Sequence, residues 1–190
     1  MGKSAAGKDK LYKKLMENEE LGLKRLVIYT TRPIRKGETD GVEYHFTDEA
    51  GMAALESAGK VIEKRRYDTA CGPWYYFTAD GEVDLEHFSY LGIGTLESFG
   101  KIRHYYGDER VIPLYIEVED GIRLERALKR EKKQAQPLYE EMCRRFLADQ
   151  QDFSEEKLAA AGIRERFDNT EPGFLCLPAL EAKIKEGEQI

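Results

Sequence analysis

The sequence contains little cysteine and no spacing typical of a disulfide framework or a zinc site. The three cysteines are far apart along the 190 residues, at Cys71, Cys143 and Cys176. An odd number of widely spaced cysteines predicts reduced thiols and a cytoplasmic protein. The three histidines are equally scattered and indicate neither a nucleophile nor a metal cluster.

Long apolar segments and an excess of basic charge are also missing. The longest apolar runs, such as residues 111–116, are far shorter than the ~20 residues that a membrane helix needs. Residues 1–10 contain no apolar core of a secretory signal. Acidic residues outnumber basic ones by 36 to 30, which gives a net charge of −6. We therefore expect neither a nucleic acid nor a membrane as partner.

The remaining composition is that of a globular protein, with 41% apolar and 35% charged residues. The sequence pattern predicts helices over 7–18, 48–58, 95–106, 120–133 and 138–150, a short one after 154 and a last one from about 178. It predicts strands over 26–29, 61–67, 74–79, 88–93, 111–118 and 163–167. This alternation favours an α/β fold with a mainly parallel sheet, which residues 30–80 interrupt as an inserted subdomain would.

The first residues match the phosphate-loop pattern G-x-x-x-x-G-K, with Gly2 at its start and Lys8 at its end. Small residues let backbone N–H groups wrap a phosphate, and the lysine reaches the outer phosphates. Asp9 stands where the pattern has a Ser or Thr that binds magnesium; a carboxylate binds magnesium but repels phosphate oxygens. The expected ATP contacts in this loop are Gly2, Ala5, Ala6, Gly7, Lys8 and Asp9, with Asp9 as the metal ligand.

A chance match in a segment rich in Gly and Lys is the alternative for this loop. In a true phosphate loop a buried strand delivers the chain into the loop, and here only Met1 precedes Gly2. We expect the chain as given to lack that strand, to be marginally stable and to hold the loop poorly.

Residues 30–46, T-T-R-P-I-R-K-G-E-T-D-G-V-E-Y-H-F, hold two arginines three positions apart around Pro33. The proline disfavours helix, and arginine forks suit a bidentate grip on phosphate. By residue type alone, a solvated basic loop is the favoured interpretation.

This segment resembles the GMP-binding signature of guanylate kinases, T-T-R-x-x-R-x-G-E-x-x-G-x-x-Y-x-F. Residues 62–63 and 74–78 resemble two further strands of that family, an apolar-Glu strand and a Y-Y-G-[ST] strand. The resemblance implies a grip on the GMP phosphate by Arg32, Arg35, Tyr44 and Tyr76. It implies that Glu63 and Thr78 read the guanine edge, whose two N–H donors suit one carboxylate.

Residues 123–147 resemble the lid of the same family, whose arginines close over ATP. Arg126 and Arg130 lie on one stripe of a predicted helix, and Arg145 lies on the next helix. The resemblance implies that Arg126 and Arg130 bind ATP and that Lys8, Arg130 and Arg145 are catalytic, neutralising charge on the transferring phosphoryl group. A solvated basic face is the alternative.

The chain departs from the family pattern at several positions besides Asp9. Ile28 replaces a serine near the GMP phosphate, and Phe77 replaces the glycine of Y-Y-G-[ST]. Gly92 and Gly94 occupy the positions of two acids that organise magnesium and guanine. Glycine admits close approach of a ligand to the backbone, so we expect a remodelled site.

The predicted fold is a P-loop α/β kinase with a core at 1–29, 81–120 and 151–190, a GMP-binding subdomain at 30–80 and a helical lid at 121–150. The predicted activity is transfer of the ATP γ-phosphoryl group to GMP, with Mg2+ accompanying ATP. Two alternatives stay open: a guanylate-kinase-like binding module without turnover, and a kinase for another nucleoside monophosphate.

Overall fold

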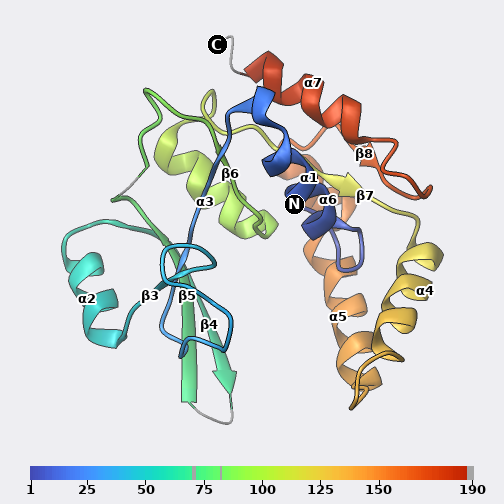
Figure 1. Cartoon of the computed structure of the whole chain (residues 1–190), viewed down its shortest axis with the longest axis horizontal. Coiled ribbons are helices and arrows are strands. Elements are labelled where there is room, and N and C mark those ends of the chain that lie inside the picture. The colour runs from blue at the N-terminus through green and yellow to red at the C-terminus, as the bar shows by residue number, and fades with distance from the viewer. Residues whose placement is uncertain (70–71, 82, 188–190) are drawn as a thin grey trace. The chain divides into compact units, whose positions relative to one another are not determined.

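The computed structural model describes residues 1–69, 72–81 and 83–187, and its elements are labelled in Figure 1. The chain forms two compact units, one of Met1–Gly22 with Ile93–Ile190 and one of Leu23–Gly92. Cys71, one of the predicted free thiols, and part of the predicted turn after Thr69 lie outside the described residues. Each unit is described below by itself.

The first unit is mainly helical. Its helices are α1 (Lys8–Glu17), η1 (Glu19–Leu21), α3 (Leu96–Tyr106), α4 (Asp120–Glu131), α5 (Tyr139–Asp152), α6 (Glu155–Ala160) and α7 (Leu177–Gly187). Thr95 caps α3 and Ser154 caps α6 by accepting backbone N–H bonds. Glu119 caps α4, since its carboxylate accepts from the N–H groups of Gly121 and Ile122.

Two short parallel strands carry the first unit's sheet, β7 (Ile116–Glu117) and β8 (Phe167–Asp168). The backbone of Met1 joins this edge, with its N–H3 donating to the Leu114 carbonyl at 2.7 Å and its carbonyl accepting from the Ile116 N–H at 2.9 Å. The predicted strand over 111–118 is shorter in the structure, where only Ile116–Glu117 form β7.

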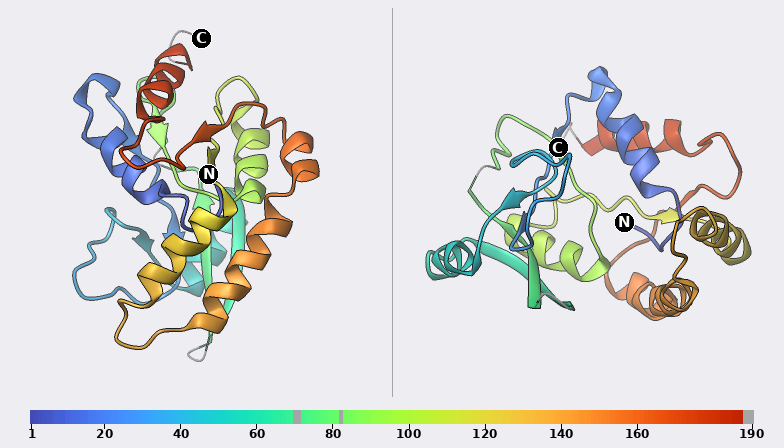
Figure 2. Two further views of the ribbon diagram at one scale, coloured as in Figure 1. Left: turned by 90° about the vertical axis from the view of Figure 1, so that its right-hand side faces the viewer. Right: turned by 60° about the horizontal axis from the view of Figure 1, so that its bottom comes forward.

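The core of the first unit lies between α3, α6 and the strand segments. Buried side chains pack there from Phe99, Tyr115, Phe153, Leu158 and Ile163. Each large apolar side chain contributes about 1.5–3 kcal/mol when fully buried. Helices α4 and α5 lie side by side (Figure 2). Within the described part of the chain, no helix has the length and apolarity needed to cross a bilayer.

The second unit is a β-rich body. Its elements are β1 (Lys24–Arg25), β2 (Tyr29–Thr30), β3 (His45–Phe46), α2 (Glu49–Ser57), β4 (Val61–Thr69), β5 (Gly72–Ala79) and β6 (Tyr90–Leu91). β1 pairs with β6 in parallel, and the order of the larger sheet is β3-β2-β5-β4. The predicted single strand over 26–29 was wrong. The half-buried segment 26–28 connects β1, which pairs with β6, to β2, which pairs with β5. The predicted strand therefore does not form one continuous strand of a single sheet.

The predicted strands over 61–67 and 74–79 form an antiparallel pair, β4 and β5. Glu63 lies opposite Thr78 and Arg65 lies opposite Tyr76, so these four side chains share one face of the sheet. Phe77, on the other face, is completely buried with Met52. The phenylalanine that replaces the glycine of the family pattern therefore fills the core beneath the hairpin.

Candidate functional site

The phosphate loop of the first unit is shaped by residues with positive φ. Gly7, the residue before α1, has φ 86°, and Ala5 has φ 62°. The left-handed region costs an alanine conformational energy, and such strain is typical of ligand-binding loops. A Cβ on Gly7 would also lie 2.7 Å from the Asn169 amide nitrogen. The loop thus needs glycine at its end, as the motif predicted.

Lys8 lies at the centre of this loop. Its Nζ donates to the carbonyl of Gly2 at 2.7 Å and to that of Lys3 at 2.8 Å. Burial lowers the pKa of Lys8, and the nearby carboxylates of Asp149 and Asp9 partly oppose this. The ammonium group of Lys8 is held by loop carbonyls, and an anionic ligand bound in the loop can replace these carbonyls as its hydrogen-bond acceptor.

Three side chains far along the sequence hold the loop. The Asp149 carboxylate on α5 accepts from the Ser4 N–H at 2.7 Å. Arg123 of α4, 1% exposed, donates to the Ser4 carbonyl at 3.0 Å, and the Asn169 amide donates to the Ala6 carbonyl at 2.9 Å. Sequence reasoning did not single out Asp149 or Asn169, since neither belongs to the loop motif or to a charge stripe.

The predicted lid arginines have different surroundings. The Arg145 Nη2 lies 3.4 Å from the Ser4 hydroxyl. Arg126 donates to the carbonyls of Asn169 and Thr170 at 3.0 and 2.7 Å, whereas Arg130 is exposed. The structure therefore brings Arg145 to the loop, engages Arg126 with the chain after β8 and leaves Arg130 in solvent.

Asp9 is the predicted magnesium ligand of the phosphate loop. Asp9 is exposed in the first turn of α1. Among the described residues, no group of three or more His, Cys, Asp or Glu is placed to hold a metal ion. Magnesium commonly keeps several waters and binds through one or two carboxylates plus substrate phosphates. The residues present fit an ion that arrives with a nucleotide.

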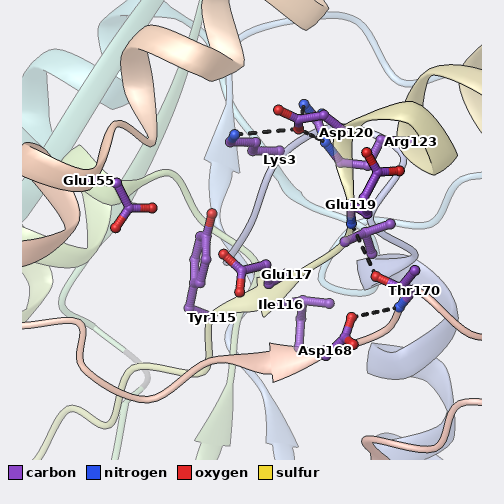
Figure 3. A pocket seen from close by; sticks show the side chains of 11 residues that line it. Lys3, Tyr115, Ile116, Glu117, Glu119, Asp120, Arg123, Glu155, Asp168 and Thr170 are labelled. Carbon is purple, nitrogen blue, oxygen red and sulfur yellow. Dashed lines mark hydrogen bonds and ion pairs between the residues drawn. The ribbon is translucent and has the colours of Figure 1, made fainter.

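A cavity of about 400 Å³ lies beside this loop (Figure 3). Carboxylates dominate its wall, with Glu117, Glu119, Asp120, Glu155 and Asp168. Lys3 reaches into it and forms an ion pair with Asp120 at 3.5 Å. The wall also contains Lys3 and Arg123, but the five acids outnumber these two cations, which disfavours phosphate groups in this cavity.

Arg32 is the central cation of the second unit. It is 3% exposed and makes two hydrogen bonds to the Glu38 carboxylate, at 2.5 and 2.8 Å. Its guanidinium lies 5.0 Å from the centre of the Tyr44 ring. The hydrogen bond to Glu38 raises the Arg32 pKa against the effect of burial, with a further bond to Tyr76. Among the residues that the structure describes, its buried Nε has no hydrogen-bond partner, which leaves this N–H as a donor for a ligand.

The predicted phosphate contacts cluster around Arg32, with one exception. The rings of Tyr44 and Tyr76 are 5.6 Å apart, whereas the Arg35 side chain is exposed. Glu38 is the residue that sequence reasoning did not assign, although it is the Glu of the matched R-x-G-E pattern. The Arg32 hydrogen bond, followed by the Arg35 backbone N–H, lowers the Glu38 pKa to about 2.

The predicted base-reading pair is buried on the hairpin. Glu63 and Thr78 are 3% and 1% exposed, and the Thr78 hydroxyl donates to Glu63 Oε1 at 2.9 Å. Arg65 adds two bonds of 3.1 Å, from Nε to Oε2 and from Nη2 to Oε1 of Glu63. The sequence pattern did not single out Arg65.

The two glycines at the expected acid positions differ in their surroundings. A Cβ on Gly92 would lie 3.0 and 3.2 Å from side-chain atoms of Leu26, so the neighbour of Gly92 is a packed apolar side chain. A Cβ on Gly94 would lie 3.4 Å from the Ser98 Cβ. Leu26 therefore takes the space into which a side chain at position 92 would project.

Comparison with known proteins finds similarity to one family. The family model described as Guanylate kinase matches residues 1–83. The guanylate kinase of Methylobacillus flagellatus is 38% identical over 81 residues, which are 43% of this chain and 38% of the relative. That of Frankia casuarinae is 44% identical over 63 residues, 33% of each chain. The chain thus matches well under half the length of these relatives.

The structural comparison covers the whole chain. A crystal structure of guanylate kinase from Anaplasma phagocytophilum has a TM-score of 0.56 at 21% identity, covering 100% of this chain and 84% of that one. This likeness shows the fold, that of a P-loop kinase with mixed α/β architecture, and confirms the predicted fold class. The family model, the relatives and the shared fold support the membership of this chain in the guanylate kinase family.

Proposed function

We propose that the protein transfers the γ-phosphoryl group of ATP to GMP, giving ADP and GDP. The observation that carries the proposal is the order of side chains on one face of the β4–β5 hairpin. Glu63 and Thr78 form a buried polar pair, and Tyr76, two residues from Thr78, contacts Tyr44 beside Arg32. A polar end for a base thus adjoins a cationic, aromatic end for a phosphate.

Arg32 supplies the positive charge at the phosphate end. Its guanidinium is held by Glu38 and faces Tyr44, and its unpartnered Nε supplies a further donor. Arginine forks match phosphate oxygens in geometry. Arg35, exposed three residues on, would close on the same phosphate, and the tyrosine hydroxyls of Tyr44 and Tyr76 would donate to it.

The ATP end of the proposal rests on the phosphate loop. The backbone N–H groups of Gly2 to Gly7 and the start of α1 would cradle the phosphates, and Lys8 would exchange loop carbonyls for the β- and γ-phosphates. Arg130 and Arg145 would neutralise charge on the transferring group. The attacking GMP oxygen is already anionic, so positioning and charge stabilisation suffice without a general base.

Magnesium belongs to this proposal as the companion of ATP. When bound, it would supply positive charge against the ATP phosphates. Asp9 would contribute the protein's carboxylate. A cytoplasmic location is part of the same proposal, since ATP and GMP are its substrates.

A steady-state assay tests the reaction. ADP formation is measured with ATP and each of GMP, AMP, CMP and UMP, and a reaction with ATP alone corrects for hydrolysis. The proposal expects GMP-dependent ADP formation that needs Mg2+. ADP formation that is equal with and without a monophosphate would exclude a kinase of this class.

A binding module without turnover is the second candidate, and the surroundings of Gly92 favour it. Leu26 packs where the acid of the family pattern would stand, so one group expected to organise metal and base has no replacement at that position. GMP binding measured by calorimetry, together with no ADP formation, would support the module.

A further inference from the structure

Both oxygens of the Glu63 carboxylate, the proposed base contact of the second unit, already bond to an arginine on the same strand. Glu63 and Arg65 lie two residues apart on β4, on the same face. Arg65 Nε bonds to Oε2 and Nη2 bonds to Oε1, both at 3.1 Å, a parallel two-bond fork. The Thr78 hydroxyl already bonds to Oε1.

Guanine would need the same edge of Glu63. Its N1–H and N2–H groups point side by side and suit the two oxygens of one carboxylate through two parallel bonds. That is the geometry that Arg65 already occupies. One carboxylate edge does not hold both forks at once.

Displacing Arg65 by a neutral base is unfavourable. The Glu63 side chain is 1% exposed and that of Arg65 is 19% exposed. Removal of the cationic partner from a buried carboxylate leaves an uncompensated charge, which is strongly destabilising. The pair is therefore expected to persist when a ligand enters.

If the Glu63–Arg65 pair persists, the groups left to contact the base are the remaining N–H donors of Arg65. An arginine carries five N–H donors, and Glu63 engages two of them. Directly opposite on β5 is Tyr76, a member of the proposed phosphate grip, so Arg65 lies between the proposed phosphate contacts and Glu63. Arginine donors match the O6 and N7 acceptors of guanine.

We infer that Arg65 is a specificity-determining residue and that the site reads 6-oxopurine monophosphates through O6 and N7. Guanine and hypoxanthine present the same two acceptors, and they differ only in the N2 amino group. GMP and IMP are then both ligands. AMP is disfavoured because its 6-amino group is a donor that faces the donors of Arg65. This inference rests on the proposed binding of a nucleoside monophosphate.

Calorimetric titration of the whole protein with GMP, IMP and AMP tests the inference without requiring turnover. The wild type is expected to bind GMP and IMP within about threefold, and AMP at least about tenfold more weakly. In Arg65→Met the edge of Glu63 opens to N1–H and N2–H, so the preference for GMP over IMP should rise by about tenfold or more. Arg66→Met is the matched control, because Arg66 lies on the opposite face and pairs with the exposed Asp68.

Arg65→Lys guards against a folding defect, since it keeps a cation beside Glu63 but lacks the fork. It should shift the ratio in the same direction as Arg65→Met, and melting curves show which variants are folded. A wild type that prefers GMP to IMP by tenfold or more, with an unchanged ratio in both variants, overturns the inference and leaves the proposed function standing. An equal loss of all three ligands in the variants also overturns it and assigns Arg65 to the phosphate. Binding of none of the three by the wild type overturns the proposed function and this inference together.

Discussion

The carboxylate of Asp149 on α5 accepts a hydrogen bond of 2.7 Å from the backbone N–H of Ser4 in the phosphate loop. Such loop N–H groups are the donors that cradle phosphate. Asp149 also lies 3.4 Å from the buried guanidinium of Arg123. A carboxylate thus occupies a position that suits a phosphate oxygen.

Neutralising this carboxylate should tighten ATP binding. Asp149→Asn removes a negative charge next to the loop, and the reduced repulsion is expected to lower the Kd of ATP by about fivefold or more. Fluorescence titration with a labelled ATP analogue measures the change. Asp152→Asn, an exposed residue of the same helix, should leave the Kd unchanged; weaker ATP binding in Asp149→Asn alone would show that the carboxylate only supports the loop.

Substitution of Lys8 should lower turnover without changing GMP binding. Lys8→Met removes the cation proposed to hold the outer phosphates, so the kcat of ADP formation should fall by at least about 100-fold. GMP affinity, measured by calorimetry, should not change, because the predicted GMP contacts belong to the other unit. Lys10→Met, exposed on the same helix, is the control. Full activity in Lys8→Met would remove the phosphate loop from the mechanism.

Glu63→Gln should weaken GMP binding. The change removes the charge that holds Arg65 and leaves an amide donor facing donors in a buried pair. The expected cost is about 2 kcal/mol, or about 30-fold in Kd. Calorimetry compares it with Glu56→Gln, an exposed change on α2. Wild-type affinity in Glu63→Gln would show that this carboxylate does not belong to the base site.

Glu38 should make the loop after β2 sensitive to acid. Its pKa is lowered from 4.5 to about 2, mainly by the hydrogen bond from Arg32. A lowered carboxyl pKa stabilises the folded state above pH 4.5, and that stabilisation is lost as the pH falls toward about 2. The difference in urea midpoint between wild type and Glu38→Gln should therefore be largest near pH 6 and should shrink below pH 4. A difference that stays constant with pH would contradict the ion pair.

Local sequence features determined much of the fold. The sequence pattern predicted α2, α3 and α6, and the structure shows that Asp48, Thr95 and Ser154 cap them locally, because a cap acts within one turn. Alternation in the strands placed Tyr76 and Thr78 on one face of β5. The same alternation puts Arg65 on the face of Glu63, but it does not reveal which atoms bond.

The arrangement of the candidate sites needed the tertiary structure. Arg123 and Arg130 belong to one stripe of α4, yet Arg123 is buried against the loop and Arg130 is exposed. A helical stripe is equally polar along its length, and packing against the loop decides which of its residues is covered.

The contacts that hold the loop join residues far apart in sequence. Ser4 and Asp149 are 145 positions apart, and Ala6 and Asn169 are 163 positions apart. Local propensity carries no information about such pairs. The sequence by itself determined the motifs, most helices and the β4–β5 strands. Only the folded chain decided that Leu26 fills the space at Gly92, that Asp149 bonds to the loop and that Arg65 closes the edge of Glu63, because these depend on how separate segments pack.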